Sequence, residues 1–137
     1  YHVKQAALSH HERCDGSGYP LGLKTNEIDD HAMIISIADV YDAMTSARKY
    51  RTPLCPFEVI AEFEKDGLSK YKPQYILTFL EHIANAYQNN RILLNDGRSA
   101  NIILLNSNHL SSPMIQLDDG TCLDLYREPN LYIKSVV

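Results

Sequence analysis

Two adjacent histidines, His10 and His11, stand just before a glycine-rich segment that ends in Tyr19-Pro20. Neighbouring residues of a helix point about 100° apart, so two adjacent imidazoles cannot chelate one ion as an i, i+4 pair does. They could serve neighbouring metal ions, or one could bind a metal and the other a substrate. The alternative is a pair of partly exposed residues at a helix end, where the helix dipole favours cations. The pair alone leaves these possibilities open.

A second candidate ligand, Asp39, lies within the mostly apolar stretch IISIADVYDAM. A carboxylate in such a stretch is expensive to bury without a cation or several hydrogen-bond donors. Asp42 follows three residues later, and helix geometry allows either side chain to act as a ligand. The alternative for Asp39 is a salt bridge, or exposure at the edge of the apolar face.

Two arginines, Arg48 and Arg51, follow at the end of the same predicted helix. Guanidinium groups there suit the helix dipole and can grip phosphate with two parallel hydrogen bonds, although such pairs are often only solvated surface. Gly16 and Gly18 allow a tight turn that would hold the ring of Tyr19 at the rim of a pocket. A Gly-Tyr-Pro tripeptide by itself also occurs in ordinary turns.

Helical periodicity predicts the elements that must position these residues. The segment 1–12 has no glycine or proline, so the two histidines are expected near the C-terminus of a helix. The next helix is expected to be capped by Asn26 and to run to about residue 47. Two further helices are expected to begin at Pro56, with a stop at Gly67, and at Pro73, with an end near residue 87.

After about residue 90, short β-rich runs replace the helical pattern. Asp96-Gly97 and Asp119-Gly120 are strong signals for tight hairpins between them. We therefore expect a mainly α chain that is α+β overall, with a helical part over residues 1–89 and a small antiparallel β extension, a sheet or open barrel, over residues 90–137.

The bulk composition excludes several classes of protein. At 137 residues the chain has the length of one domain with a small appendage. Its net charge of −4 argues against broad attachment to nucleic-acid polymers or anionic membranes. Its three cysteines have no zinc-site spacing and indicate free thiols in a reducing compartment. No apolar run approaches the length that crosses a bilayer, so we expect no membrane span in this segment.

Taken together, HHERCDGSGYP followed by IADVYDAMTSARKYR resembles the HD-GYP family, a bacterial branch of the HD-domain superfamily. The resemblance covers residues 1–66 with clear motifs and extends more loosely to about residue 88. It implies a helical, cytoplasmic phosphodiesterase domain that hydrolyses cyclic di-GMP to pGpG or GMP. It also implies two or three divalent metal ions, and diguanylate cyclase (GGDEF) domains as partners that contact the Gly-Tyr-Pro loop.

The resemblance also implies roles for individual residues. By their place in the motifs, the metal ligands are expected to be His10, His11 and Asp39, the substrate-binding residues Tyr19, Arg48 and Arg51, and the loop-shaping residues Gly16, Gly18 and Pro20. Imidazole and carboxylate together suit iron or manganese. Adjacent histidines are useful where each serves a different ion of a two-metal site, which stabilises both oxygens of a phosphodiester displacement.

The His-Asp dipeptide that gives the family its name is missing from this sequence, where only the reverse, Asp30-His31, occurs. We therefore expect the chain to be the C-terminal part of a longer polypeptide. An incomplete ligand set predicts little or no phosphodiesterase activity for the chain alone. Apolar helix faces left uncovered would favour self-association. The alternative is a non-catalytic HD-GYP-like module that senses nucleotides or docks onto partner proteins.

Overall fold

The computed structural model describes residues 2–24, 27–47 and 52–137, and in this part of the chain all the α-helices precede the strands. The helices are α1 (His2–Ser9), α2 (Asp30–Thr45), α3 (Pro56–Lys70) and α4 (Pro73–Ala86). The strands are β1 (Arg91–Leu94), β2 (Ser99–Leu104), β3 (Met114–Leu117), β4 (Cys122–Asp124) and β5 (Ile133–Val136), with a short 3₁₀ helix, η2 (Leu125–Arg127), before β5. The predicted fold class, a helical part followed by a small antiparallel β extension, is confirmed.

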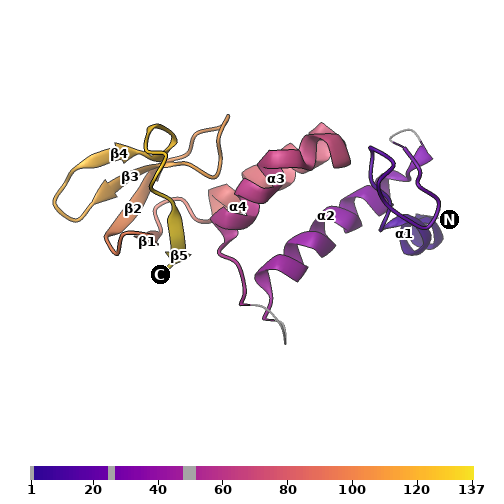
Figure 1. The fold of residues 1–137 in the computed structure, drawn as a ribbon, viewed down its shortest axis with the longest axis horizontal. Helices are drawn as coiled ribbons and strands as arrows, with labels where there is room; N and C mark the ends of the chain where they lie inside the picture. Colours follow the sequence, from indigo (N-terminus) through magenta and orange to yellow (C-terminus); the bar gives the residue numbers. More distant parts are fainter. Residues whose placement is uncertain (1, 25–26, 48–51) are drawn as a thin grey trace.

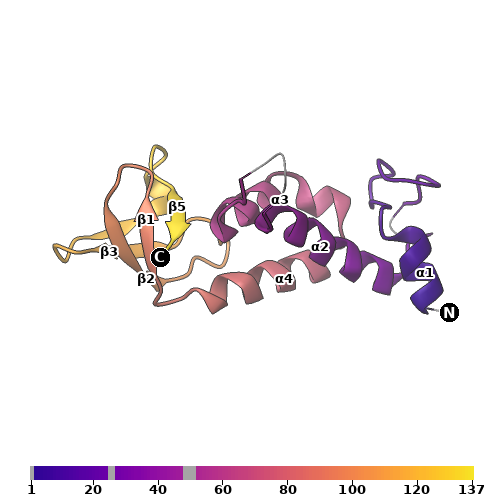
Figure 2. The ribbon, with the colours of Figure 1, turned by 90° about the horizontal axis from the view of Figure 1, so that it is seen from below.

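The molecule is elongated, with the sheet at one end and α1 at the other (Figure 1). Helices α2, α3 and α4 lie between these ends and run along the long axis, as Figure 2 also shows. Among the described helices, none combines the length and the apolar character that crossing a membrane requires.

Helix α2 begins at a side-chain cap. The carboxylate of Asp29 accepts hydrogen bonds from the backbone N–H of His31, at 3.0 Å, and of Ala32, at 3.4 Å. These bonds satisfy two of the N–H groups that a helix leaves without a partner in its first turn. Asn26, the cap expected from the sequence, lies outside the described residues, and the helix starts four positions after it.

Helix α3 continues beyond Gly67, where the sequence predicted its end. The helix instead ends at Lys70, and Tyr71 follows as its cap. Tyr71 is buried in the core, and the carbonyl of Lys70 accepts a 2.7 Å hydrogen bond from the backbone N–H of Cys14. These tertiary contacts outweigh the low helix propensity of one glycine.

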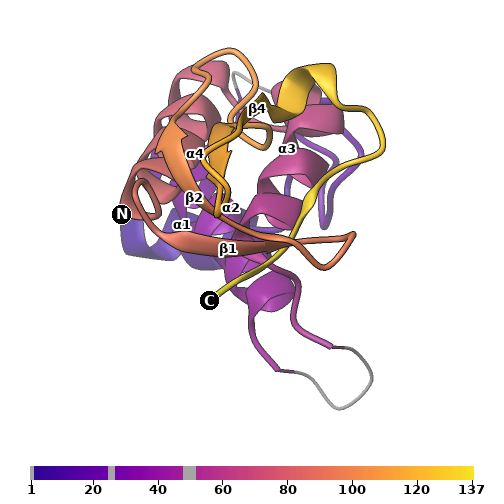
Figure 3. The same ribbon diagram turned by 90° about the vertical axis from the view of Figure 1, so that its left-hand side faces the viewer.

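The described strands form one antiparallel sheet in the order β4-β3-β2-β1-β5. The turns between β1 and β2 and between β3 and β4 contain Gly97 and Gly120, each at a φ of 91°, as the Asp-Gly dipeptides predicted. Such left-handed conformations favour glycine because a Cβ atom would be strained there. Viewed from the sheet end, the strands lie in front of α3 and α4 (Figure 3).

One hydrophobic cluster contains buried residues from both the helices and the sheet, among them Ile60 and Phe63 of α3 and Ile92 and Ile133 of the strands. The carboxylate of Glu64 on α3 also accepts hydrogen bonds from the backbone N–H groups of Leu110, at 3.0 Å, and Ser111, at 3.3 Å. The change from helix to strand falls between residues 86 and 91. The division into domains 1–89 and 90–137 stays a proposal, and the two parts pack through a shared core.

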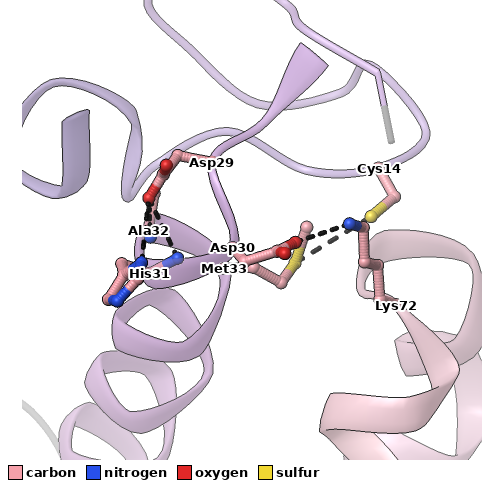
Figure 4. Close-up of polar contacts among 7 residues, drawn as sticks. All are labelled: Cys14, Asp29, Asp30, His31, Ala32, Met33 and Lys72. Atoms are coloured by element: carbon pink, nitrogen blue, oxygen red, sulfur yellow. Dashed lines mark hydrogen bonds and ion pairs between the residues drawn. The ribbon is translucent and has the colours of Figure 1, made fainter. Parts of the chain in front are cut away.

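An ion pair joins the first turn of α2 to the start of α4. The Lys72 ammonium donates a 2.5 Å hydrogen bond to the carboxylate of Asp30, close to Cys14 and Met33, whose sulfur atoms are 3.9 Å apart (Figure 4). The hydrogen bond from Lys72 lowers the pKa of Asp30, and the same contact raises the pKa of Lys72. Both side chains are partly solvated, so the pair is a modest source of stability.

We predict that Asp30→Asn lowers the free energy of unfolding at pH 7 by less than about 1 kcal/mol. Because the folded pKa of Asp30 is below its ordinary value of 3.8, its contribution is present above that value and is lost as pH falls further. Because the pKa of Lys72 is raised in the folded protein, the stabilisation by the ion pair is also lost at high pH, as pH rises above about 10.5. Urea unfolding at pH 3 and pH 7 checks this. The difference should also vanish in a Lys72→Met background.

Candidate functional site

The two histidines lie in the turn that directly follows α1. Nδ1 of His10 lies 3.1 Å from the carbonyl oxygens of Ala6 and of Ala7. A carbonyl oxygen only accepts hydrogen bonds, so Nδ1 carries the ring proton and Nε2 of the neutral ring keeps its lone pair. A backbone carbonyl that fixes the tautomer in this way is the usual companion of a metal-ligating histidine.

The ring of His11 is held between two others. Its centroid is 3.9 Å from that of His10, at an interplanar angle of 44°, and 4.7 Å from that of Tyr19, at 15°. The backbone N–H of Tyr19 donates a 3.2 Å hydrogen bond to the carbonyl of His11. The structure therefore brings together one residue expected to bind metal and one expected to bind substrate, with Tyr19 still 61% exposed.

The loop that carries Tyr19 folds back at Gly18 onto the turn that follows α1. A Cβ atom on Gly18 would lie 2.3 Å from the carbonyl oxygen of His11 and 2.6 Å from the backbone of Glu12 and Arg13. Gly16 has a φ of 80°, and the peptide bond between Tyr19 and Pro20 is cis. Of the three residues expected to shape the loop, Gly16 adopts a conformation that favours glycine, Gly18 lies against the backbone of the turn after α1, and Pro20 follows the cis peptide bond.

Asp39 of α2 and His10 border the same pocket, which has a volume of about 380 Å³ and is otherwise lined by Val3, Ala6, Ala7 and Ile35. The side chain of Asp39 is exposed, which is one of the alternatives that the sequence left open. Ile35, one turn earlier on α2, is 47% exposed, so this face of the helix is open to solvent and the carboxylate needs no buried partner. A carboxylate and an imidazole nevertheless share one concave surface.

The candidate ligands His10, His11 and Asp39 supply only part of the coordination shell of a divalent metal ion. Among residues 2–24, 27–47 and 52–137, no three His, Cys, Asp or Glu side chains lie close enough together to hold an ion. The lone pair of His10 Nε2 and the Asp39 carboxylate suit iron or manganese, and His11 lies in ring contact with His10. The donor chemistry fits, but the set of ligands is incomplete. Arg48 and Arg51 lie outside the described residues.

Glu12 is a residue of this site that the sequence reasoning missed. It is 1% exposed, and its two carboxylate oxygens accept hydrogen bonds from the backbone N–H groups of Leu21, at 2.6 Å, and Leu23, at 2.8 Å. A signal was present in the sequence, because a glycine-rich loop folded against a helix has N–H groups that need acceptors. An acidic residue directly before such a loop can supply them.

Arg13, also missed, ties the same turn to α2 and to the residue after α3. One of its terminal nitrogens donates hydrogen bonds to the carbonyls of His10, at 3.2 Å, and Glu12, at 2.9 Å, and to the Ser36 hydroxyl, at 2.7 Å. Its guanidinium carbon lies 5.3 Å from the centroid of the Tyr71 ring. Burial raises the pKa of Tyr71, and the nearby Arg13 charge opposes that rise. Arg13 therefore holds the histidine turn against the helical core.

Comparison with known families places the helical part of the chain. The model of the HD-domain family matches residues 1–75, which are more than half of the sequence and contain α1, α2, α3 and the Gly-Tyr-Pro loop.

Three relatives illustrate the similarity to individual proteins. A cyclic di-GMP phosphodiesterase of Thermotoga maritima is 44% identical over 77 residues, which cover 56% of this chain and 21% of the relative. A 3'3'-cGAMP-specific phosphodiesterase of Vibrio cholerae is 54% identical over 58 residues, 42% of this chain and 14% of the relative. A cyclic di-GMP phosphodiesterase of Pseudomonas aeruginosa is 31% identical over 116 residues, 84% of this chain and 28% of the relative. The chain thus spans between 14% and 28% of their lengths.

The alignment with the Pseudomonas protein reaches past the helices. An alignment of 116 residues in a chain of 137 is too long to stop before β1 and β2, so it runs past the end of α4 at Ala86 and includes both strands. The similarity to that relative therefore extends into the β extension.

Proposed function

We propose, on the premise that the chain belongs to the HD-GYP branch of the HD-domain family, that it is the C-terminal part of a metal-dependent phosphodiesterase domain for cyclic di-GMP. The observation that carries this proposal is the pocket bordered by both His10 and Asp39, next to the stacked rings of His11 and Tyr19. Relatives named as cyclic di-GMP phosphodiesterases support the substrate class, and the cGAMP-specific relatives make the other cyclic dinucleotide the natural competitor.

Different side chains would have different roles in such a site, some in binding metal and one in binding substrate. His10, His11 and Asp39 would hold the divalent ions, which supply a hydroxide near neutral pH and stabilise the phosphodiester oxygens when bound. The carbonyls of Ala6 and Ala7 hold the proton of His10 on Nδ1, so Nε2 is the atom available to a ligand. Tyr19, which has its ring stacked on His11 and remains exposed, offers an aromatic surface beside the ions for a planar base.

The chain alone is expected to hydrolyse little or no cyclic di-GMP in the presence of Mn²⁺ or Fe²⁺, because three ligands on one side leave the ions open to water. A longer polypeptide that carries the His-Asp half upstream of Tyr1 is expected to hydrolyse it, and His10→Gln or Asp39→Asn in that polypeptide should abolish turnover. Product analysis by chromatography checks both. Turnover by the chain alone contradicts the incomplete site. A longer polypeptide that neither hydrolyses nor binds cyclic di-GMP contradicts the proposed function.

A second candidate is a non-catalytic module that docks onto diguanylate cyclase (GGDEF) domains through the Gly-Tyr-Pro loop. The exposure of Tyr19 and of Leu21, at 61% and 69%, favours it, because large apolar side chains at a loop tip suit protein contacts. In that case the longer polypeptide captures a purified GGDEF domain without hydrolysing cyclic di-GMP, and Leu21→Ser abolishes the capture. Self-association is a further proposal. It is supported by large apolar side chains that are exposed on α1, α2 and α4, namely Val3, Ile34, Ile35 and Leu77.

A further inference from the structure

We infer that Glu12 is a positioning residue, whose buried carboxylate fixes the Gly-Tyr-Pro loop so that the ring of Tyr19 lies on the ring of His11. Its consequence for metal and substrate rests on the proposed function, whereas its geometric part does not. Glu12 belongs to the turn that bears both histidines, and its two acceptors act on the far side of the loop, at Leu21 and Leu23.

Because Glu12 is buried, its carboxylate needs hydrogen-bond donors from the protein. A carboxylate that is 1% exposed has lost its water, and it remains stable only where donors replace that water. The two N–H groups do so, with one for each oxygen. The loop in turn has two N–H groups that would lose their acceptor in the protein if the carboxylate were absent. Each side therefore needs the other.

The contacts of the loop show why Tyr19 is the residue that Glu12 positions. On one side of it, the loop is tied to the helix end by the hydrogen bond from the Tyr19 N–H to the His11 carbonyl. On the other side, the Leu21 N–H is tied to Glu12. An isolated β-bridge between Asp15 and Lys24 closes the base of the loop. With both flanks held, the Tyr19 ring is fixed parallel to His11, at 15°.

The variant Glu12→Gln tests the inference, because glutamine keeps the shape but replaces one acceptor oxygen by an NH₂ donor. One loop N–H then faces another donor, and the loop should detach. Glu64→Gln is the matched control, since Glu64 also accepts two backbone N–H bonds, one on each oxygen, but at Leu110 and Ser111. Both variants lose the same kind of bond, and only one of them touches the loop.

The readout is the NMR resonance of the His11 ring in the histidine-labelled chain, which the stacked Tyr19 ring shifts. It is assigned with His11→Gln, and Tyr19→Leu gives its position without the stack. In Glu12→Gln the resonance should move to the Tyr19→Leu position, and in Glu64→Gln it should stay. An unmoved resonance in folded Glu12→Gln overturns the inference. If that variant does not fold, Glu12→Asp is read instead, and an unmoved resonance there also overturns it.

A second measurement separates this inference from the proposed function. In the longer, active polypeptide, Glu12→Gln should raise KM for cyclic di-GMP by about tenfold, which is the effect of one lost hydrogen bond to a charged group. The KM of the Glu64→Gln control should stay near that of wild type. If wild type binds neither Mn²⁺ nor cyclic di-GMP while the His11 resonance still moves, the proposed function fails and the positioning role stands. If wild type is active and neither KM nor the resonance responds to Glu12→Gln, the positioning role alone fails.

Discussion

Gly18→Ala is expected to push the Gly-Tyr-Pro loop off the end of α1 and to lower the free energy of unfolding by about 2 kcal/mol or more. The added methyl group would lie 2.3 Å from the carbonyl oxygen of His11 and 2.6 Å from the backbone atoms of Glu12 and Arg13. All three obstacles are backbone atoms, which cannot rotate away as the end of a long side chain can. Gly18 is not in the left-handed region, so the clash alone produces the effect.

Urea unfolding and amide hydrogen exchange measure this result. The N–H groups of Tyr19, Leu21 and Leu23 should exchange faster in the variant, because their acceptors are no longer in reach. Gly67→Ala is the matched control, since its methyl group would meet Phe63 and Ile76 at an ordinary 3.6 Å inside α3. That change should be neutral or stabilise by up to about 1 kcal/mol. Equal stability of the two variants would contradict the close approach at Gly18.

The second large effect is expected from Arg13→Met, which should lower the free energy of unfolding by about 2–3 kcal/mol. Methionine keeps much of the apolar stem but leaves the carbonyls of His10 and Glu12 and the hydroxyl of Ser36 without this donor. It also removes the cation that lies 5.3 Å from the centre of the Tyr71 ring. The turn that carries the histidines would then lose its hydrogen bond to Ser36 of α2.

Arg13→Lys separates charge from packing. Lysine keeps a cation and three donors on one nitrogen but lacks the flat guanidinium group, so its stability should fall between those of wild type and Arg13→Met. Urea unfolding checks the order of the three proteins. Ultraviolet titration, with Tyr71→Phe to identify the signal, should show a further rise of the Tyr71 pKa in Arg13→Met, since Arg13 opposes the rise that burial causes. Identical stability of the lysine and methionine variants would contradict a role for the charge.

Local sequence signals predicted most of the fold because they act between near neighbours. Pro56 and Pro73 begin the helices that they were expected to begin, and the two Asp-Gly turns form hairpins. The end of α3 was missed, because the burial of Tyr71 and the bond to Cys14 come from residues far away in the chain. Propensity at one glycine carries no information about such contacts.

The site was predictable to a different extent. The motif indicated which side chains could act together, and His10 and Asp39 do border one pocket, although the ligand roles stay a prediction. The sequence left the exposure of Asp39 open, because an apolar run does not reveal which face of the helix is covered. Glu12 and Arg13 were missed because several of their partners are distant in the sequence: Leu21 lies 9 positions after Glu12, and Tyr71 lies 58 positions after Arg13. Only the folded chain brings those partners near.

The pairing of β5 with β1 has a consequence for how the chain acquires its structure. Ile92 pairs with Val136 and Leu94 with Ile133, so about forty residues separate partners that lie next to each other. The edge of β1 that pairs with β5 stays uncovered until β5 has been made, and the hairpins form earlier because their partners are close in sequence. During synthesis the pairing of β5 with β1 should therefore form after the hairpins. Until then, a ribosome-bound intermediate would expose the unpaired backbone N–H and C=O groups of β1, which can pair with another chain.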